Sequence, residues 1–268
     1  MSANTFALIH FPFFQLDPEK GRGVEYFIKQ TLEKEGNKVL IIRPDIPFFV
    51  FFYKIYRKIN KVFKKEFHYY RKKIILNSLA KSTNAKLEDI NYDYVISFGT
   101  LPMYNVVSSK PKIMWSDTTF SNILNYYNDY KKLTDNEINE FQDVELNGLN
   151  NSDYIFLTSE WATKSAINDY NIDKSKVFEL PFGANLLEEI NDNEIDLNKK
   201  ADTLDELNLL FIGKNWVRKG GELVFELCKK LQEKNIKYKL NIILHLPQYK
   251  FLDYEFYFCR FEHVLREP

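Results

Sequence analysis

The sequence predicts an α/β protein in which the strands of a parallel sheet alternate with helices. Three observations lead to this fold class. Apolar runs of strand length recur along the chain, apolar residues at helical spacing fill the intervals, and glycines or prolines separate the two patterns. Strands that alternate with helices in this way form βαβ units and a doubly wound sheet. We therefore expect a Rossmann-like domain at the N-terminal side.

The first βαβ unit is predicted near the start of the chain. The apolar runs FALIHFP, residues 6–12, and KVLIIRP, residues 38–44, are both of strand length. Between them, VEYFIKQTLEKEG has apolar residues at helical spacing and ends at Gly36, a typical helix stop. Strand, helix and strand within so short a stretch predict parallel pairing.

The same alternation continues through the following segments. Further strands are predicted at residues 92–99, 112–117, 153–159 and 176–183. Thr134 and Glu137 have the spacing of a capping box, and Ser159 is placed to cap the next helix. These elements complete a domain that we expect to span residues 1–190.

A second α/β region is predicted after an acidic, polar linker at residues 191–206. Residues 207–268 begin with an apolar run, continue through a basic turn into an amphipathic helix, and include another strand at 237–246. This region is short for a complete sheet, so we expect an incomplete second domain.

Composition narrows the functional classes. Lysine plus arginine and aspartate plus glutamate both number 37, and this balance argues against a nucleic-acid partner. Two cysteines suit neither a disulfide framework nor a metal cluster, so we expect a reduced compartment and no metal. The N-terminus lacks a basic segment typical of a signal peptide, and no apolar run has membrane-spanning length. We expect a cytoplasmic protein, at most peripheral to the inner face of a membrane.

Residues 47–73 form an aromatic and basic segment. Nine lysines and arginines lie between Lys54 and Lys73, against the single acid Glu66. Such a segment suits an anionic membrane surface, with the aromatic side chains toward the lipid and the cations toward the headgroups. The alternative is a helix whose aromatic face packs on its own sheet while the lysines meet water. The sequence leaves both interpretations open.

The turn at residues 213–221 is a candidate anion site. Lys214, Arg218 and Lys219 surround the passage from a strand into a helix, and the start of a helix offers amide groups and a partial positive charge. This arrangement suits a phosphate or pyrophosphate, and an ordinary solvated basic turn is the alternative. The spacing is neither that of a P-loop nor that of a dinucleotide-binding loop.

Two other places are candidates for a site. Asp117 ends a predicted strand, where open α/β sheets form their ligand crevice, and could act as base, as hydrogen-bond acceptor or as helix cap. Gly21, Arg22 and Gly23 precede the first helix. Glycines there allow another molecule or domain to approach the backbone, with a plain turn as the alternative.

Several of these segments together resemble one enzyme family. FIGKNWVRKGGELVFEL is similar to a G-[RK]-x4-K-G motif, with Gly213, Lys214, Lys219 and Gly220 on its positions. ELPFGAN, which includes Gly183, TSEWA and EKGRGVEYF also resemble ordered motifs of that family. The family is the retaining glycosyltransferases of family 4, which have the two-domain GT-B fold.

The resemblance implies an acceptor-binding first domain and a second domain that binds a nucleotide-sugar such as a UDP- or GDP-sugar. Lys214 and Lys219, with Arg218 beside them, would face the diphosphate of the donor, where cations stabilise the charge of the departing group. Gly23 and Gly183 would lie in the loops near the cleft. The acceptor would be a glycan or a lipid-linked sugar in surface polysaccharide assembly, and no separate cofactor is implied.

Two departures from the family pattern bear on activity. The family often has a His-Asp pair where this sequence has only Asp117, and the E-x7-E motif of the donor domain is not found. A regular donor domain would need on the order of a hundred further residues. We therefore expect a truncated enzyme, inactive alone unless a partner chain completes the donor domain. The alternatives are a non-catalytic module that binds an acceptor or a membrane surface, and a different nucleotide-binding α/β protein.

Overall fold

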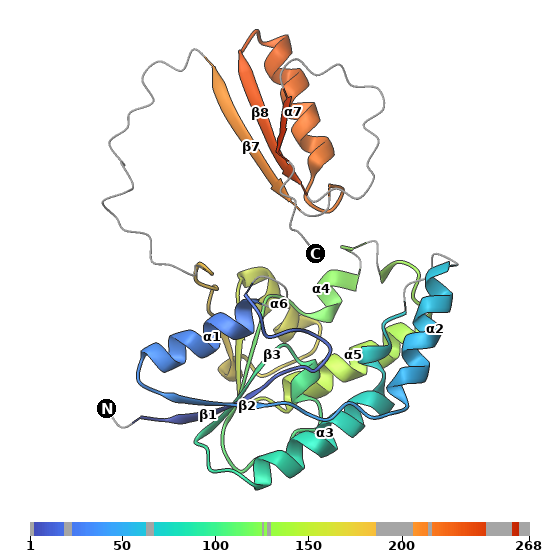
Figure 1. Cartoon of the computed structure of the whole chain (residues 1–268), viewed down its shortest axis with the longest axis vertical. Helices are drawn as coiled ribbons and strands as arrows, with labels where there is room; N and C mark the ends of the chain where they lie inside the picture. The colour runs from blue at the N-terminus through green and yellow to red at the C-terminus, as the bar shows by residue number, and fades with distance from the viewer. Residues whose placement is uncertain are drawn as a thin grey trace. The chain divides into compact units, whose positions relative to one another are not determined.

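The computed structural model describes residues 3–18, 23–62, 67–124, 126–127, 130–185, 206–213, 216–244 and 259–262. The chain divides into two units, Met1–Glu189 and Ile190–Pro268, and each is described by itself (Figure 1). The predicted linker at 191–206 falls almost entirely outside the described residues.

The first unit is built on a six-stranded parallel sheet with the order β2-β1-β3-β4-β5-β6. Every strand expected from the apolar runs of this unit is present. The strands are β1 Thr5–Ile9, β2 Lys38–Ile42, β3 Tyr94–Phe98, β4 Lys112–Ser116, β5 Tyr154–Leu157 and β6 Val177–Glu179. The predicted parallel α/β sheet is therefore confirmed.

The two faces of this sheet are covered very differently. Helix α1, Gly23–Lys34, packs on one face through Ile28, which joins Leu8 and Ile96 in one buried cluster. The opposite face carries the remaining large helices and buries most of the core. They are α3 Lys73–Glu88, α5 Asp135–Asn150 and α6 Glu160–Asn168. Figure 1 shows α1 and α3 on opposite sides of β1 and β2.

This asymmetry follows from the strand order and the handedness of the connections. The chain runs from β1 to β2 in one direction across the sheet, and from β2 through β3 to β6 in the other. Right-handed crossovers place the helix of the first connection on one face and the helices of the later connections on the other. Strands β3 to β6 consequently have one face with little helical cover, where Tyr154 and Phe178 are exposed.

Two more helices and three short turns complete the description of the first unit's described residues. Helix α2 occupies Val50–Val62 and the short helix α4 occupies Phe120–Leu124. Short 3-10 turns lie at Tyr69–Arg71, Leu101–Met103 and Lys174–Lys176, labelled η1, η2 and η4.

The predicted helix boundary signals are confirmed in the first unit. Thr134 and Glu137 form the reciprocal hydrogen bonds of a capping box at the start of α5. The side chain of Ser159 accepts a hydrogen bond from the amide of Ala162 at the start of α6. Gly36 follows α1 with φ of 81°, a left-handed conformation that glycine adopts without strain.

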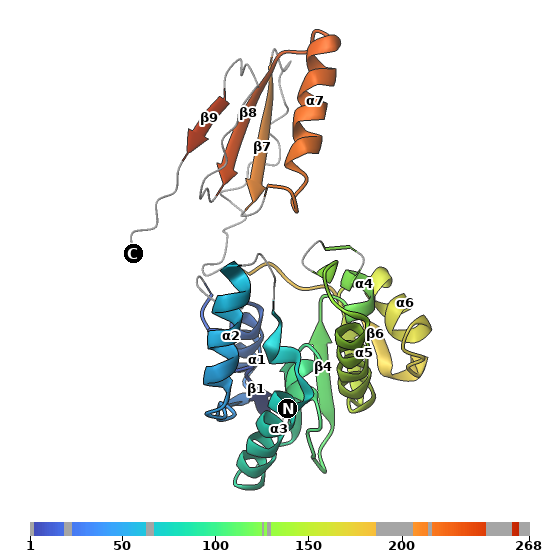
Figure 2. The same ribbon diagram turned by 90° about the vertical axis from the view of Figure 1, so that its right-hand side faces the viewer.

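The described residues of the second unit form three parallel strands in the order β7-β8-β9 and one helix. These elements are β7 Leu207–Gly213, α7 Gly221–Glu233, β8 Tyr238–Leu244 and β9 Cys259–Glu262 (Figure 2). Phe211, Trp216, Phe225 and Ile242 form its buried cluster with Cys228 and Leu240. The strand expected at 237–246 is confirmed, whereas β9 was not predicted.

Candidate functional site

The strand order identifies where a ligand crevice of the first unit should lie. β1 and β3 are neighbours, and the chain leaves β1 toward one edge of the sheet and β3 toward the other. Open α/β sheets bind ligands beyond the carboxyl ends of the two strands at such a switch point. The residues that follow these strands are His10 and Phe11 after β1, and Gly99 and Thr100 after β3.

A buried contact between a histidine and a glutamate lies at this switch point. Nδ1 of His10 contacts Oε2 of Glu25, in the first turn of α1, and Nε2 of His10 lies 2.9 Å from the carbonyl oxygen of Phe14. Both ring nitrogens of His10 are therefore engaged, one by a side chain and the other by the main chain. Among the described residues, Oε1 of Glu25 has no hydrogen-bond partner although it is buried. The pair therefore fixes α1 to the end of β1.

A second buried carboxylate lies behind the loop that follows β3. Oε2 of Glu145 in α5 accepts a 2.6 Å hydrogen bond from the hydroxyl of Thr100, and its Oε1 accepts one of 3.1 Å from the amide of Phe120. Arg71 lies 4.0 Å from this carboxylate, with its guanidinium 5.0 Å from the centre of the Phe120 ring. Burial raises the pKa of Glu145, while the Arg71 charge and the hydrogen bond from Thr100 oppose that shift.

Asp117 lies at the carboxyl end of β4, one strand beyond the switch point, and its side chain is exposed. Its main-chain carbonyl accepts a 3.1 Å hydrogen bond from the Thr158 hydroxyl. Thr119, rather than Asp117, accepts a hydrogen bond from the amide of Asn122 at the start of α4. A capping role for Asp117 is therefore not seen, and its carboxylate faces solvent, where it can act as acceptor or base.

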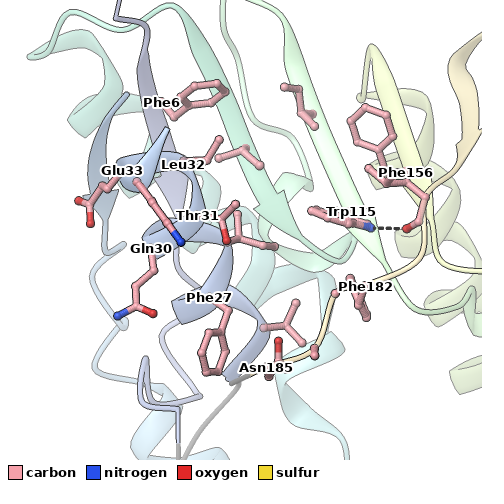
Figure 3. A pocket seen from close by; sticks show the side chains of 18 residues that line it. Phe6, Phe27, Gln30, Thr31, Leu32, Glu33, Trp115, Phe156, Phe182 and Asn185 are labelled. Atoms are coloured by element: carbon pink, nitrogen blue, oxygen red, sulfur yellow. Dashed lines mark hydrogen bonds between the residues drawn. The ribbon is translucent and has the colours of Figure 1, made fainter. Parts of the chain in front are cut away.

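An apolar pocket of about 700 Å³ lies between α1 and the sparsely covered face of the sheet. Figure 3 shows Phe27 from α1, Trp115 from β4 and Phe156 from β5 among its lining side chains. Gly183 also lines this pocket, whereas Gly23 is the first residue of α1 and approaches the carbonyl of Pro18. The lining suits an apolar group with few directional contacts.

Trp115 fixes one wall of this pocket. Its indole Nε1 donates a 3.0 Å hydrogen bond to the carbonyl of Leu180, and its ring lies 5.3 Å from that of Phe182 (Figure 3). These contacts hold the segment after β6 against the sheet. Gly183 therefore occupies a defined place beside α1, although the sequence predicted only that it would lie near a cleft.

The basic turn of the second unit joins β7 to α7. Arg218 and Lys219 are both exposed. A side chain added at Gly213 would place its Cβ 3.0 Å from Cγ of Lys219, so the lysine stem packs on the end of β7 where glycine leaves room. Trp216 is buried under Gly221, and its indole donates a 2.8 Å hydrogen bond to Glu222.

The start of α7 differs from the expectation of unpaired amide groups. The amide of Gly221 donates to the carbonyl of Trp216 at 2.9 Å, and those of Leu223 and Val224 donate to the carbonyl of Gly220 at 3.0 and 3.3 Å. These three amides are already bonded within the turn and the first turn of the helix, so they are not free to bind a ligand. Lys214, Gly21 and Arg22 lie outside the described residues.

Comparisons with known proteins address the fold. No protein-family model matches the sequence, and no curated protein matches it. Sucrose-phosphate synthase from Thermosynechococcus elongatus superposes with a TM-score of 0.54 at 15% identity, over 90% of this chain and 62% of that one. A glycosyltransferase from Rickettsia africae gives 0.49 at 14% identity, over 91% and 61%. The glycosyltransferase SnogD from Streptomyces nogalater gives 0.43 at 8% identity, over 97% and 72%.

The chain has a GT-B-type α/β fold. It spans about 62% of the length of the sucrose-phosphate synthase, and identity at this level establishes the fold alone. The fold class that the sequence resemblance implied is confirmed.

Within the described ranges, no cluster of three or more histidine, cysteine or acidic side chains could hold a metal ion. In the same part of the chain, every helix is too short or too polar to cross a bilayer.

Within this GT-B-type fold, two buried groups were missed by sequence reasoning. Glu145 lies on the buried stripe of α5, at helical spacing from Phe141 and Leu149, and a carboxylate in such a stripe is a signal that could have been found. The partnership of His10 with Glu25 had no comparable signal, because it depends on how α1 packs across the end of β1.

Proposed function

We propose that this protein is a glycosyltransferase of the retaining family 4 type, which transfers a sugar from a nucleotide-sugar to a glycan or lipid-linked acceptor. The observation that carries the proposal is the basic turn after β7. There Lys219 is exposed on the strand-to-helix passage of a parallel α/β unit, with its stem packed on Gly213. The sucrose-phosphate synthase described above supports the proposal, because this chain shares its fold.

The turn suits the diphosphate of a nucleotide-sugar because its cations can neutralise the charge that develops on the leaving group. Lys219 and Arg218 supply this charge in the described residues, and Lys214 is proposed to join them on the strength of the sequence motif. Main-chain amides contribute less than expected, since those of Gly221, Leu223 and Val224 are bonded within the turn.

The first unit is proposed to bind the acceptor. Asp117 is exposed at the carboxyl end of β4, where a carboxylate can accept a proton or orient an acceptor hydroxyl. Gly183 and the apolar pocket beside α1 lie on the same unit and offer a place for an apolar part of an acceptor. A membrane contact, one of the two interpretations of residues 47–73, is a further proposal, which the exposed apolar side chains of α2 support.

Calorimetric titration of the full chain with UDP- and GDP-sugars tests the donor site. We expect binding by the wild type and at least about tenfold weaker binding by Lys219→Ala, because one charge-assisted contact is lost. Lys230→Ala is the matched control, since Lys230 is exposed in the last turn of the same helix. Equal binding by Lys219→Ala, or no binding of any nucleotide-sugar by the wild type, would contradict the proposal.

Turnover is tested separately from binding. Release of nucleotide from a bound nucleotide-sugar in the presence of glycan or lipid-linked acceptors would support transfer by this chain. Donor binding without turnover, followed by turnover on addition of a second protein, would support a partner chain that completes the donor half. Donor binding that never leads to turnover would favour a non-catalytic binding module and contradict the enzymatic part of the proposal.

A further inference from the structure

Helix α2 presents an unusually apolar outer face. Six large apolar side chains of this helix are exposed, among them Phe51 at 63% and Val62 at 79%. Figures 1 and 2 show α2 at the outside of the first unit. The exposed set is Phe51, Phe52, Ile55, Tyr56, Ile59 and Val62. Soluble proteins rarely leave so many adjoining apolar groups in water unless something covers them.

Side chains on the inner side of α2, with Tyr56 at the edge of the exposed set, attach the helix to its own domain. Val50 is buried, and Tyr53 stacks on Phe67 with ring centroids 6.1 Å apart and an angle of 11° between the ring planes. Tyr56 of the exposed set also contacts Phe67, edge to face, with ring centroids 4.9 Å apart, whereas the rings of Phe51 and Phe52 contact each other. This arrangement is not the one in which the aromatic face packs on the sheet and only lysines meet water.

The exposed apolar residues form one continuous stripe. At 100° per residue, the six side chains fall within an arc of about 140°, and Lys58 and then Lys54 lie beside one edge of that arc. Tyr53 and Val50 lie on the opposite side, which faces the domain. An apolar stripe bordered by cations is the pattern of a helix that lies in the plane of a membrane surface.

The cations of α2 are available to an outside partner. Lys54 and Lys58, which border the stripe, are exposed, and neither forms an ion pair within the described ranges. Farther along the segment, Lys72 and Lys73 are held by acids of α5, at 2.7 Å from Glu140 and 2.8 Å from Asp143. The contact surface is therefore narrower than residues 47–73.

From these observations we propose that the outer face of α2 docks on an anionic lipid membrane, with the apolar stripe among the acyl chains and Lys54 and Lys58 among the headgroups. Charge complementarity favours an anionic membrane over a second copy of the chain as the partner of this stripe. In a symmetric pair of chains joined through α2, the two lysines of both copies would approach one another. Anionic lipid offers the opposite charge along the whole edge of the helix.

Docking through α2 would also place the candidate site near lipid. Helix α2 follows β2 after a short loop, so it begins on the side of the sheet where the strands end and where Asp117 lies. This consequence, access to a lipid-linked acceptor, rests on the proposed glycosyltransferase function. The membrane contact itself does not, because it depends only on the surface of α2.

Flotation of the full chain with lipid vesicles tests the proposal. We expect binding to phosphatidylcholine vesicles that contain about a third phosphatidylglycerol, and much weaker binding to phosphatidylcholine alone. The variant Phe51→Ser/Phe52→Ser/Val62→Ser should lose at least about tenfold in partitioning. Because these side chains are exposed, circular dichroism should show an unchanged fold.

Matched variants separate the apolar and the electrostatic contributions. Val107→Ser and Leu223→Ser remove apolar side chains that are 71% and 68% exposed elsewhere, and should bind as the wild type does. Lys54→Gln/Lys58→Gln should lose most of the preference for anionic vesicles.

Three outcomes would overturn the membrane assignment. The first is wild-type protein that does not float with anionic vesicles, and the second is an apolar triple variant that floats as well as the wild type. The third is a wild-type dimer in sedimentation that the apolar variant dissociates, which would assign the stripe to a second copy of the chain. Failure of nucleotide-sugar binding would leave the flotation result unaffected, so the two proposals are distinguishable.

Discussion

The hydroxyl of Thr100 donates a 2.6 Å hydrogen bond to the carboxylate of Glu145, and so joins the loop after β3 to the buried face of α5. The same carboxylate accepts the amide of Phe120, at the start of α4. One buried side chain thus organises two loops at the carboxyl edge of the sheet, close to Asp117.

Replacement of Glu145 by glutamine tests this arrangement through pH. Burial raises the pKa of Glu145 above its ordinary value of 4.5, so the folded state binds this proton more tightly than the unfolded state does. The stability that Glu145 contributes is therefore fully present at pH values below the pKa that it has in the unfolded chain. It is lost as the pH rises through the higher pKa that Glu145 has in the folded protein.

We expect the free energy of unfolding of the wild type, measured against Glu145→Gln, to fall as pH rises from acid toward neutral, with a slope of up to about 1.4 kcal/mol per pH unit. Urea unfolding at several pH values provides the measurement. Glu88→Gln, which alters an exposed carboxylate, is the control and should show little such dependence. A pH-independent difference between wild type and Glu145→Gln would contradict the pKa shift.

Gly148→Ala should destabilise the first unit. A Cβ at this position of α5 would lie 2.5 Å from the carbonyl oxygen of Thr100 and 2.7 Å from its Cβ. Overpacking typically costs about 1–3 kcal/mol, whereas alanine gains about 1 kcal/mol over glycine inside a helix. We expect a net loss in urea unfolding, with Gly183→Ala as control because its Cβ would meet no atom within 4 Å. A more stable Gly148→Ala would show that Thr100 can move away.

The capping box of α5 predicts the effect of a change at Thr134. Its side chain accepts the amide of Glu137, and the Glu137 carboxylate accepts the amide of Thr134 in return. Thr134→Ala should lower the free energy of unfolding by about 1 kcal/mol. Thr134→Ser should keep most of the stabilisation, because its hydroxyl can still accept the hydrogen bond of the cap. Equal stability of the alanine and serine variants would mean that solvent replaces the cap at no cost.

Gly221→Ala should disturb the second unit through Trp216. The indole ring lies directly over Gly221, so a methyl group there would overlap it, and Trp216 also contacts Phe211 and Phe225. We expect a loss of about 1–3 kcal/mol and a red shift of the tryptophan fluorescence as the ring becomes more exposed. Leu223→Ala, an exposed position of the same helix, serves as the control. An unshifted spectrum at wild-type stability would contradict this packing.

Asp117→Asn tests the proposed role of the acceptor-side carboxylate. The side chain is exposed, so the variant should fold with wild-type stability. We expect sugar transfer to fall at least about tenfold, because the amide cannot accept a proton, while nucleotide-sugar binding stays unchanged. Transfer at the wild-type rate would remove Asp117 from the chemistry.

Much of the secondary structure was predictable because its signals are local. The strands of both units, except β9, coincide with apolar runs, and Thr134 and Ser159 stand where caps were expected. Caps and apolar periodicity depend on neighbours within a few residues, so one sequence contains the whole signal.

The candidate site was only partly predictable because its contacts join distant segments. Asp117 was found from its place at the end of a strand, but the sequence did not show that Thr119 takes the capping role. His10 and Glu25 lie 15 residues apart along the chain, and Thr100 and Glu145 lie 45 residues apart. Such pairs follow from the strand order, which local propensity does not specify.

The sequence by itself determined the alternation of strands and helices, the basic turn at Arg218 and Lys219, and the mixture of aromatic and basic residues in α2. Only the tertiary structure decided that the sheet has the order β2-β1-β3-β4-β5-β6, and that Tyr53 packs inward while Phe51 and Phe52 face solvent. The physical reason is that an amphipathic helix offers more than one apolar stripe, and the rest of the fold selects which stripe it buries.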